Sequence, residues 1–194
     1  MENKESLFTI VQNLRNDCAL KQKRGLHFIL ASVLIWLAIL LIHRTNLSIQ
    51  AKNLYTFFCT TPLMPMAYFV PKLIKVDFQN KENPLTNLGI LFSVNQMLYI
   101  LIAMWIFSSV PDKMLMVYAM IFGAHLLPYG WLYQSKTYYI LSVIIPIVAL
   151  LLGLYYSSAI LAIVMLFIEL LFLTISSFIS VINETNSTLL EQLT

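Results

Sequence analysis

Two ionisable residues lie deep inside apolar runs of this 194-residue sequence, where charge is costly and a functional role is therefore the first hypothesis. Glu169 is near the middle of the run 158–182, and His125 is within the run 114–133. A charged, unpaired glutamate there would cost at least about 2.5–3.5 kcal/mol, so we expect Glu169 to face other helices, with Ser176 continuing its helical stripe. Two interpretations stay open for Glu169: a protonatable coupling or gating site, or a protonated carboxyl that hydrogen-bonds to a neighbouring helix.

Further polar side chains fall at a depth similar to that of His125. At 1.5 Å per residue, Asn95 is about 10 Å from the start of its run and His125 about 12 Å from the end of its run, and both of these ends are predicted below to be cytoplasmic. Asn95 and Tyr99 share one helical face, and His125 and Tyr129 share another, since residues four apart are neighbours on a helix. Gln96 is rotated by about 100° from Asn95. We expect a polar layer of Asn95 or Gln96 with His125 and Tyr129, although simple hydrogen bonding between helices explains these residues equally well.

Prolines inside the apolar runs mark candidate helix breaks, and these are Pro62, Pro65 and Pro128. Proline lacks a backbone N–H and leaves a carbonyl unpaired, so a broken helix in a membrane is expected to line a cavity. Near Pro128 we expect a kinked helix with a pocket at His125. An interfacial aromatic belt is the preferred interpretation for Trp131 and Tyr133.

The elements that must position these residues are long apolar runs. Hydrophobic residues make up 59% of the chain and charged residues 11%, against about 45–50% and about 25% in soluble domains. Six runs each approach or exceed the roughly 20 residues that cross ~30 Å of hydrocarbon. The sequence therefore predicts an all-α polytopic membrane bundle of about six transmembrane helices in residues 26–183, followed by a short tail, 184–194. The predicted spans are approximately 26–43, 53–73, 87–107, 114–133, 137–155 and 158–182.

Residues 1–25 are predicted to form an amphipathic helix that precedes the bundle. Apolar residues recur at helical spacing along this segment, and basic residues are densest next to the first run. We expect the helix to lie in the membrane interface against anionic headgroups, with a helix packed on the bundle as the rival that need not exclude it. We expect no cleavable signal peptide, because the first apolar run starts only near Leu26 and no A-x-A site follows it.

The distribution of Lys and Arg predicts the orientation. With the N-terminus inside, nine of the twelve Lys and Arg residues fall on the cytoplasmic side and three on the outer side. The positive-inside rule therefore predicts a cell-membrane protein with both termini in the cytoplasm. The net charge of +3, gathered at the ends of the runs, suits lipid headgroups rather than nucleic acid.

A set of short strings resembles a family of small, multi-pass bacterial membrane proteins known only as a domain of unknown function. The strings are Asn83-Pro84-Leu85 leading into Leu88-Gly89-Ile90-Leu91-Phe92, then Asn95-Gln96-x-Leu98-Tyr99, and Ala124-His125-x-x-Pro128-Tyr129-Gly130-Trp131-Leu132-Tyr133. The resemblance covers most of the chain from Leu26 to about Leu154. It implies a bacterial cytoplasmic-membrane location and assigns no activity.

Three function classes are compatible with these features. A small secondary transporter or channel-like protein for a small solute or ion comes first, as an expected homo-oligomer, because of the broken helices and the midplane glutamate. A non-enzymatic accessory, sensor or immunity protein is the alternative. An intramembrane lipid-modifying enzyme ranks third, because HExxH and G-x-S-x-G motifs are lacking; we expect no catalytic residue, metal or cofactor, and Cys18 and Cys59 have no metal-type spacing.

Overall fold

The computed structural model describes residues 2–60 and 82–193, with side chains for residues 6–60 and 82–182. Throughout this part of the chain the regular elements are helical and no strand occurs, which confirms the predicted all-α bundle. The elements in chain order are α1 (Glu2–Lys21), η1 (Lys23–Gly25), α2 (Leu26–His43), α3 (Ile49–Thr60), α5 (Leu85–Ser109), η2 (Pro111–Lys113), α6 (Met114–Ala124), α7 (Leu126–Leu132), α8 (Lys136–Tyr155) and α9 (Ser158–Leu193).

Five of the described helical segments are long and apolar enough to cross a membrane: Lys23–His43, Leu85–Ser109, Pro111–Leu132, Lys136–Tyr155 and Ser158–Ile182. A helix pairs its own backbone N–H and C=O groups, which is the condition for a chain in hydrocarbon. These segments coincide with five of the predicted spans. The other predicted span, 53–73, begins in α3, and its remaining residues, with the candidate breaks Pro62 and Pro65, lie outside the described residues.

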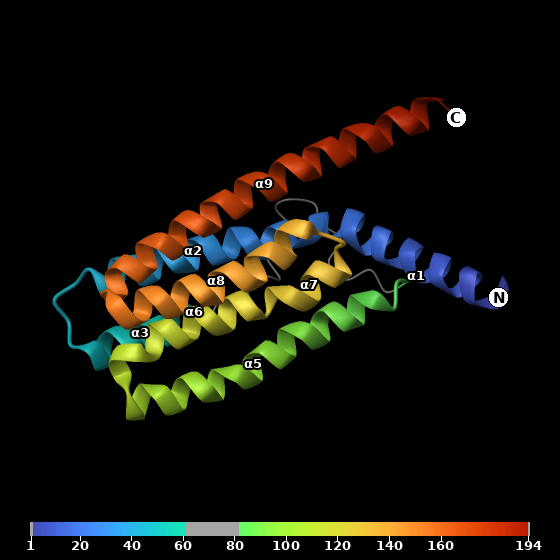
Figure 1. Cartoon of the computed structure of the whole chain (residues 1–194). Helices are drawn as coiled ribbons and strands as arrows, with labels where there is room; N and C mark the ends of the chain where they lie inside the picture. The colour runs from blue at the N-terminus through green and yellow to red at the C-terminus, as the bar shows by residue number, and fades with distance from the viewer. Residues whose placement is uncertain (1, 61–81, 194) are drawn as a thin grey trace.

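The bundle is held by two extensive helix pairs, α2 with α9 and α6 with α8 (Figure 1). Glycine permits the close approach of the second pair. A Cβ atom at Gly123 of α6 would lie 2.6 Å from Ile145 Cγ2 and 2.5 Å from Pro146 Cδ on α8. A Cβ atom at Gly153 of α8 would lie 2.4 Å from Met116 Cβ on α6. Small residues of this kind let helix backbones approach in membranes, where packing rather than the hydrophobic effect drives association.

The helix over the fourth predicted span is divided into α6 and α7, which meet at His125. The backbone N–H of His125 still donates to the carbonyl of Ile121 at 3.1 Å. Pro128 follows three residues later and has no N–H for the carbonyl of Ala124. The interruption therefore falls within the turn that precedes the proline, and His125 is the residue at the junction.

The last helix is longer than the span predicted in it. α9 runs from Ser158 to Leu193, whereas its membrane-compatible part ends at Ile182. Residues beyond Ile182 are mostly polar, so the helix continues after its apolar sequence ends. The segment predicted as a short tail, 184–194, is helical as far as Leu193.

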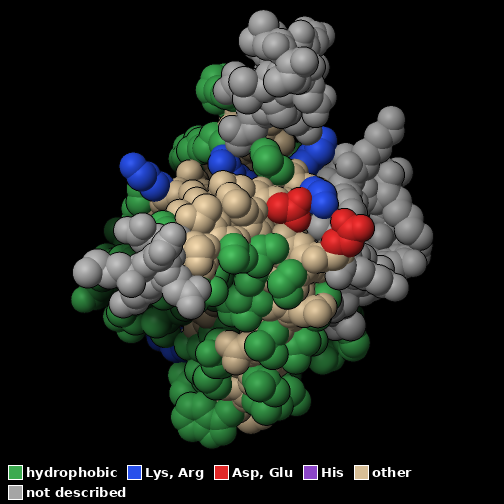
Figure 2. Space-filling view, turned by 90° about the vertical axis from the view of Figure 1, so that its right-hand side faces the viewer, with side chains coloured by type: hydrophobic (Ala, Val, Ile, Leu, Met, Phe, Trp, Pro, Cys, Tyr) green, Lys and Arg blue, Asp and Glu red, His purple; other side chains and the backbone are tan. Residues whose placement is uncertain are grey.

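Both chain termini lie at one end of the bundle, and the α2–α3, α5–α6 and α8–α9 connections lie at the other (Figure 1). Figure 2 faces the end that carries the termini and shows basic and acidic side chains near the middle of this face, with hydrophobic side chains around and below them. One ion pair here joins Lys21 Nζ to Asp17 Oδ1 at 3.0 Å.

The second half of α1 packs against this end of the bundle. The Arg15 guanidinium donates to the Trp131 carbonyl at 2.9 and 2.5 Å and lies 4.5 Å from the centroid of the Trp131 ring. Asn83, just before α5, donates to the Leu14 carbonyl at 2.8 Å and to Asp17 Oδ2 at 2.7 Å. These contacts correspond to the rival interpretation of this helix, packing on the bundle.

The first half of α1 is different, since Leu7, Phe8 and Ile10 are exposed. Exposed apolar side chains on a helix that continues from a membrane bundle suit the interface of a bilayer. An interfacial position for this half of α1 therefore stays a prediction.

Candidate functional site

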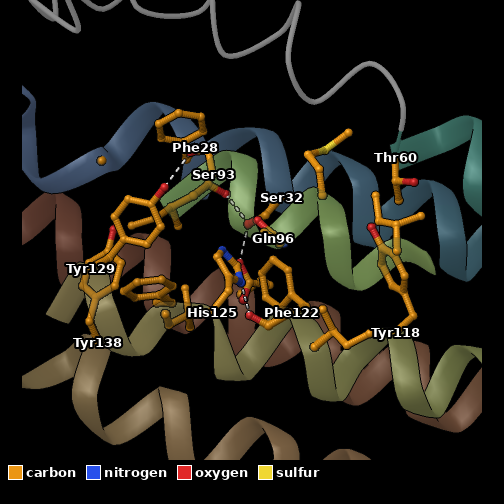
Figure 3. A pocket seen from close by; sticks show the side chains of 18 of the residues that line it. Phe28, Ser32, Thr60, Ser93, Gln96, Tyr118, Phe122, His125, Tyr129 and Tyr138 are labelled. Atoms are coloured by element: carbon orange, nitrogen blue, oxygen red, sulfur yellow. Dashed lines mark hydrogen bonds between the residues drawn. The ribbon is translucent and has the colours of Figure 1, made fainter. Parts of the chain in front are cut away.

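A cavity of about 90 Å³ lies among α2, α5, α6, α7, α8 and α9, reaching also the end of α3 (Figure 3). Its polar lining comes from side chains of four helices and the α6–α7 junction: Ser32, Thr60, Ser93, Gln96, His125 and Glu169. Its aromatic lining is Phe28, Tyr118, Phe122, Tyr129, Tyr133, Tyr138 and Phe172. No Lys, Arg or Asp is among the described residues that line it.

Glu169 of α9 is fully buried, with 0% of its surface exposed. Its Oε2 accepts a hydrogen bond from the Ser32 hydroxyl of α2. Its Oε1 has no hydrogen-bond partner among the described residues, and no ion pair to Glu169 occurs among them. The carboxyl is therefore held at one oxygen, while the other keeps its hydrogen-bonding capacity unused on a residue that lines the cavity.

The helical period places Glu169 at this point. Buried residues follow one face of α9 at spacings of three and four: Leu161, Ala162, Met165, Glu169, Phe172 and Ser176. On α2, Ala31 is fully buried beside Ser32. Small residues at this interface bring α2 and α9 together closely enough for a serine, whose side chain is short, to reach the carboxyl.

His125 lines the same cavity from the junction of α6 and α7. Its Nδ1 pairs with the Phe122 carbonyl, which can only accept, so Nδ1 carries the proton. In the neutral ring the other nitrogen, Nε2, is then a hydrogen-bond acceptor. The ring makes edge-on contacts with Phe122, at 5.3 Å between centroids, and with Tyr129, at 5.9 Å, and these contacts restrict its orientation.

Tyr129 is tied to α5 by its hydroxyl. The Tyr129 oxygen lies 2.6 Å from Ser93 Oγ and 3.0 Å from the carbonyl oxygen of Gly89. Ser93 also reaches that carbonyl, at 3.3 Å. The two hydroxyl hydrogens are thus used within this group of three, and Tyr129 joins α7 to α5 as one wall of the cavity.

Aromatic rings continue from Tyr129 to the end of the bundle where the termini lie. Tyr129 stacks on Tyr133 at 5.8 Å between centroids, and Tyr133 meets Tyr138 at 5.7 Å. The Tyr133 hydroxyl donates to Gln22 Oε1 at 2.8 Å, and the Tyr138 hydroxyl donates to the Arg24 carbonyl at 2.7 Å. The belt interpretation is wrong for Tyr133, which is buried, because the turn after α7 directs it inward under η1.

Gly25 connects η1 to α2 at this end of the cavity. It has a positive φ of 72°, a conformation that L side chains rarely adopt. A Cβ atom here would also lie 3.0 Å from the Tyr138 hydroxyl and 3.1 Å from the Tyr133 ring. Glycine therefore allows the chain to turn directly over both tyrosines.

The structure brings some of the predicted site residues together and separates others. Glu169, His125, Gln96 and Tyr129 line one cavity. Asn95 and Tyr99 lie on an exposed face of α5 instead, where Asn95 Nδ2 donates to the Tyr99 hydroxyl at 3.1 Å. Ser176 is buried seven residues beyond Glu169 and does not line the cavity. Pro128 is in α7, three residues after His125.

Ser32, Ser93 and Tyr138 also belong to the site and were not singled out by the sequence. Ser32 is the one hydroxyl residue within the run 26–43, which is a usable signal. It was not decisive, because a serine in a membrane helix readily hydrogen-bonds within its own helix, as Ser32 also does to the Ile29 carbonyl at 2.8 Å.

The chemistry of this arrangement is binding and proton exchange. Glu169 can hold a proton, His125 presents an acceptor nitrogen, and aromatic rings make up much of the lining shared by both. Among the described residues, no group of three or more His, Cys, Asp and Glu side chains could hold a metal ion.

Comparison with known families matches residues 11–178 to the model of one family, described as a family of unknown function (DUF7010). The match covers most of the chain and agrees with the resemblance seen in its short strings. Neither a curated protein nor a solved structure matches the chain.

Proposed function

The chain belongs to this family of unknown function, DUF7010, and we propose that it is a small membrane transport protein. In this proposal the cavity holds a small solute or ion during its passage, and Glu169 exchanges a proton for it. The single observation that carries the proposal is the fully buried Glu169, whose Oε1 meets no partner among the described residues. Ionisable groups inside a membrane are rare, and they commonly mark the pathways of substrates, ions or protons.

The surroundings of Glu169 explain why a proton and a solute would compete. Its carboxylate form needs a positive partner in a medium of low dielectric constant, and no ion pair supplies one. The titratable groups that line the cavity with Glu169 are His125 between α6 and α7, Tyr138 on α8, and Tyr118, Tyr129 and Tyr133. Only histidine, when protonated, would carry a charge opposite to that of the carboxylate. A bound proton or a bound cation must therefore balance the carboxylate.

Orientation is part of the proposal. Placement of both termini at one end of the bundle supports an arrangement in which they share a side of the membrane (Figure 1). The count of nine against three basic residues favours the cytoplasm of a bacterial cell for that side. Anionic headgroups would then contact the exposed first half of α1, and reporter fusions at both termini, active only in the cytoplasm, test this placement.

The transport proposal is tested in proteoliposomes loaded with a pH-sensitive dye. Potassium, glycine, glucose and tetramethylammonium are added outside in turn, and proton movement is followed. We expect one of these solutes to drive proton flux in the wild type, with loss of that flux in Glu169→Gln and His125→Ala. The matched control is Glu82→Gln, an exposed glutamate before α5. Flux that is unchanged in Glu169→Gln, or absent for every solute, would overturn the proposal.

A second function, as an accessory subunit of a membrane complex, is favoured by one observation. Asn95 and Tyr99 form a polar pair on the exposed face of α5, next to the exposed apolar side chains of Val94, Met97 and Leu98. Polar side chains exposed to lipid are unfavourable, and pairing with another helix relieves the cost. A partner protein, or a second copy of this chain, would cover the pair. Purification in mild detergent should then yield a stable complex that Asn95→Leu disrupts and the nearby substitution Ser108→Ala leaves intact.

A further inference from the structure

We infer that the cavity binds a small organic cation, a protonated amine with one apolar group, through the free oxygen of Glu169 and the surrounding aromatic rings. Its role as cargo rests on the proposed function; its binding does not. Three features of the cavity carry the inference: the direction of its hydroxyl hydrogens, the sign of its charge and the nature of its walls.

Most of the hydroxyl groups that line the cavity donate their hydrogens to other groups of the protein. Tyr133 donates to Gln22 Oε1, and Tyr138 donates to the Arg24 carbonyl. Thr60 donates to the Phe57 carbonyl at 2.8 Å. A hydroxyl has a single hydrogen, so each of these oxygens can offer only lone pairs to a ligand.

The serines behave in the same way. Ser93 and Tyr129 share their two hydrogens between each other and the Gly89 carbonyl. Ser32 has two acceptors in reach, Glu169 Oε2 and the Ile29 carbonyl. The Tyr118 hydroxyl is hydrogen-bonded to Thr60, so the lining donor left for a ligand is the Gln96 amide, whereas acceptors are abundant. A site of this kind selects a ligand that brings its own hydrogens.

The charge of the cavity has the sign that suits such a ligand. Glu169 is the one acidic side chain among the described lining residues, and none of these residues is Lys or Arg. Its Oε1 is buried and unpartnered, and His125 presents Nε2 as a further acceptor. An ammonium group could donate to these acceptors and neutralise the carboxylate at the same time. An anion would meet a carboxylate and few donors.

The walls fit the rest of an organic amine. Phe172 meets Tyr138 edge-on at 4.8 Å between centroids, and Phe122 meets Trp36 edge-on at 5.8 Å. Phe122, Tyr138 and Phe172 line the cavity, as Glu169 does, and Figure 3 shows Phe122 and Tyr138 among its side chains. Aromatic faces attract a cation more strongly when water is excluded, and they also cover its apolar group. A volume of about 90 Å³ restricts the ligand to a small amine.

Binding to the purified full-length chain in lipid nanodiscs tests this inference. The probes are ethylammonium, ethanol and acetate, which share a two-carbon frame small enough for the cavity and differ in charge, and empty nanodiscs correct for partition into lipid. Isothermal titration should show saturable binding of ethylammonium, with ethanol and acetate at least about tenfold weaker. Glu169→Gln should weaken ethylammonium binding at least tenfold, while Glu82→Gln, outside the cavity, should leave it unchanged.

The amide of Glu169→Gln can still accept from Ser32, so this variant is expected to fold, and its helical circular dichroism and elution volume are the measurements that check this. If it fails to fold, Phe172→Leu, which removes one aromatic face, serves instead and should weaken ethylammonium more than ethanol. Equal binding of all three probes, or binding of acetate alone, would overturn the inference. Binding of ethylammonium without any solute-driven proton flux would leave the inference standing and remove the transport proposal. Flux with potassium or glycine, without binding of ethylammonium, would remove the inference and leave the transport proposal standing.

Discussion

Ser32 on α2 donates a hydrogen bond to Glu169 on α9, although 137 positions separate them in the chain. The bond crosses one of the two most extensive helix pairs of the bundle and is buried on all sides. It links the packing of α2 and α9 to the cavity, because the same residue joins the two helices and lines the cavity.

Replacement of Ser32 by alanine should therefore destabilise the bundle through Glu169. The substitution removes the donor and leaves both carboxyl oxygens buried without a partner. Hydrogen bonds between membrane helices are worth about 0.6–1.7 kcal/mol, so a double-mutant cycle of Ser32→Ala with Glu169→Leu should give a coupling of about that size. Unfolding in mixed micelles measures it. Ser142→Ala is the control, since Ser142 is buried but bonds to Tyr139 of its own helix, and it should show no coupling to Glu169.

Gly123→Ala should loosen the pair formed by α6 and α8. The added methyl group would lie 2.6 Å from Ile145 Cγ2 and 2.7 Å from Ile145 Cβ, which cannot move without a shift of the helix. Overpacking of this kind typically costs about 1–3 kcal/mol. Gly89→Ala is the matched control, because its methyl group would meet only the flexible end of Leu132 at 3.2 Å. Thermal unfolding should separate the two variants, and equal midpoints would contradict the packing described for α6 and α8.

The fold was largely predictable because apolar runs of membrane length specify helices by themselves. Glu169 and His125 were found for a related reason: an ionisable group in an apolar run stands out in any sequence. The partners of these residues were not predictable. The membrane helices are apolar on all sides, so their sequence does not show which face is internal, and Ser32 costs little wherever it points. Gln96 and Asn95 show the same limit, since only the packing of α5 decided which of the two reached the cavity.

Tyr133→Phe should destabilise the end of the bundle beneath α1. The Tyr133 hydroxyl is the donor to Gln22 Oε1, and both side chains are buried, at 1% and 2% exposure. Without it a buried amide oxygen loses its partner, which costs about 1–3 kcal/mol. Tyr139→Phe is the control, because the Tyr139 side chain is exposed. The free energy of unfolding in mixed micelles should fall for Tyr133→Phe alone, and a similar fall in both variants would show that the Gln22 bond contributes nothing.

The attachment of α1 to the bundle can be followed through Cys18, which is buried beside Thr86 of α5. Burial raises the pKa of the Cys18 thiol, and the charge of Asp17 adds to this effect, so less thiolate forms at a given pH than on a free cysteine. In a Cys59→Ser background, labelling by a maleimide should be slow at neutral pH and should accelerate at a higher pH than labelling of a free thiol. Because the pKa is raised in the folded state, this contribution to stability is complete below the ordinary pKa of the thiol and is lost as pH rises above it.

Asn83→Ala provides the second arm of this test, since it removes the bonds from Asn83 to Leu14 and Asp17 that hold α1 against α5. If α1 then separates from the bundle more often, labelling of Cys18 should become about tenfold faster, which corresponds to ~1.4 kcal/mol less free energy for opening. Asn87→Ala, on the exposed side of the same helix start, is the control and should leave the rate unchanged. Rapid labelling in the parent protein at neutral pH, equal to that of a free thiol, would mean that α1 does not stay on the bundle. The bonds from Arg15 to Trp131, from Asn83 to Leu14 and from Tyr133 to Gln22 would then form only transiently. Separation of α1 and η1 from Tyr133 and Tyr138 would open the cavity toward the end where the termini lie.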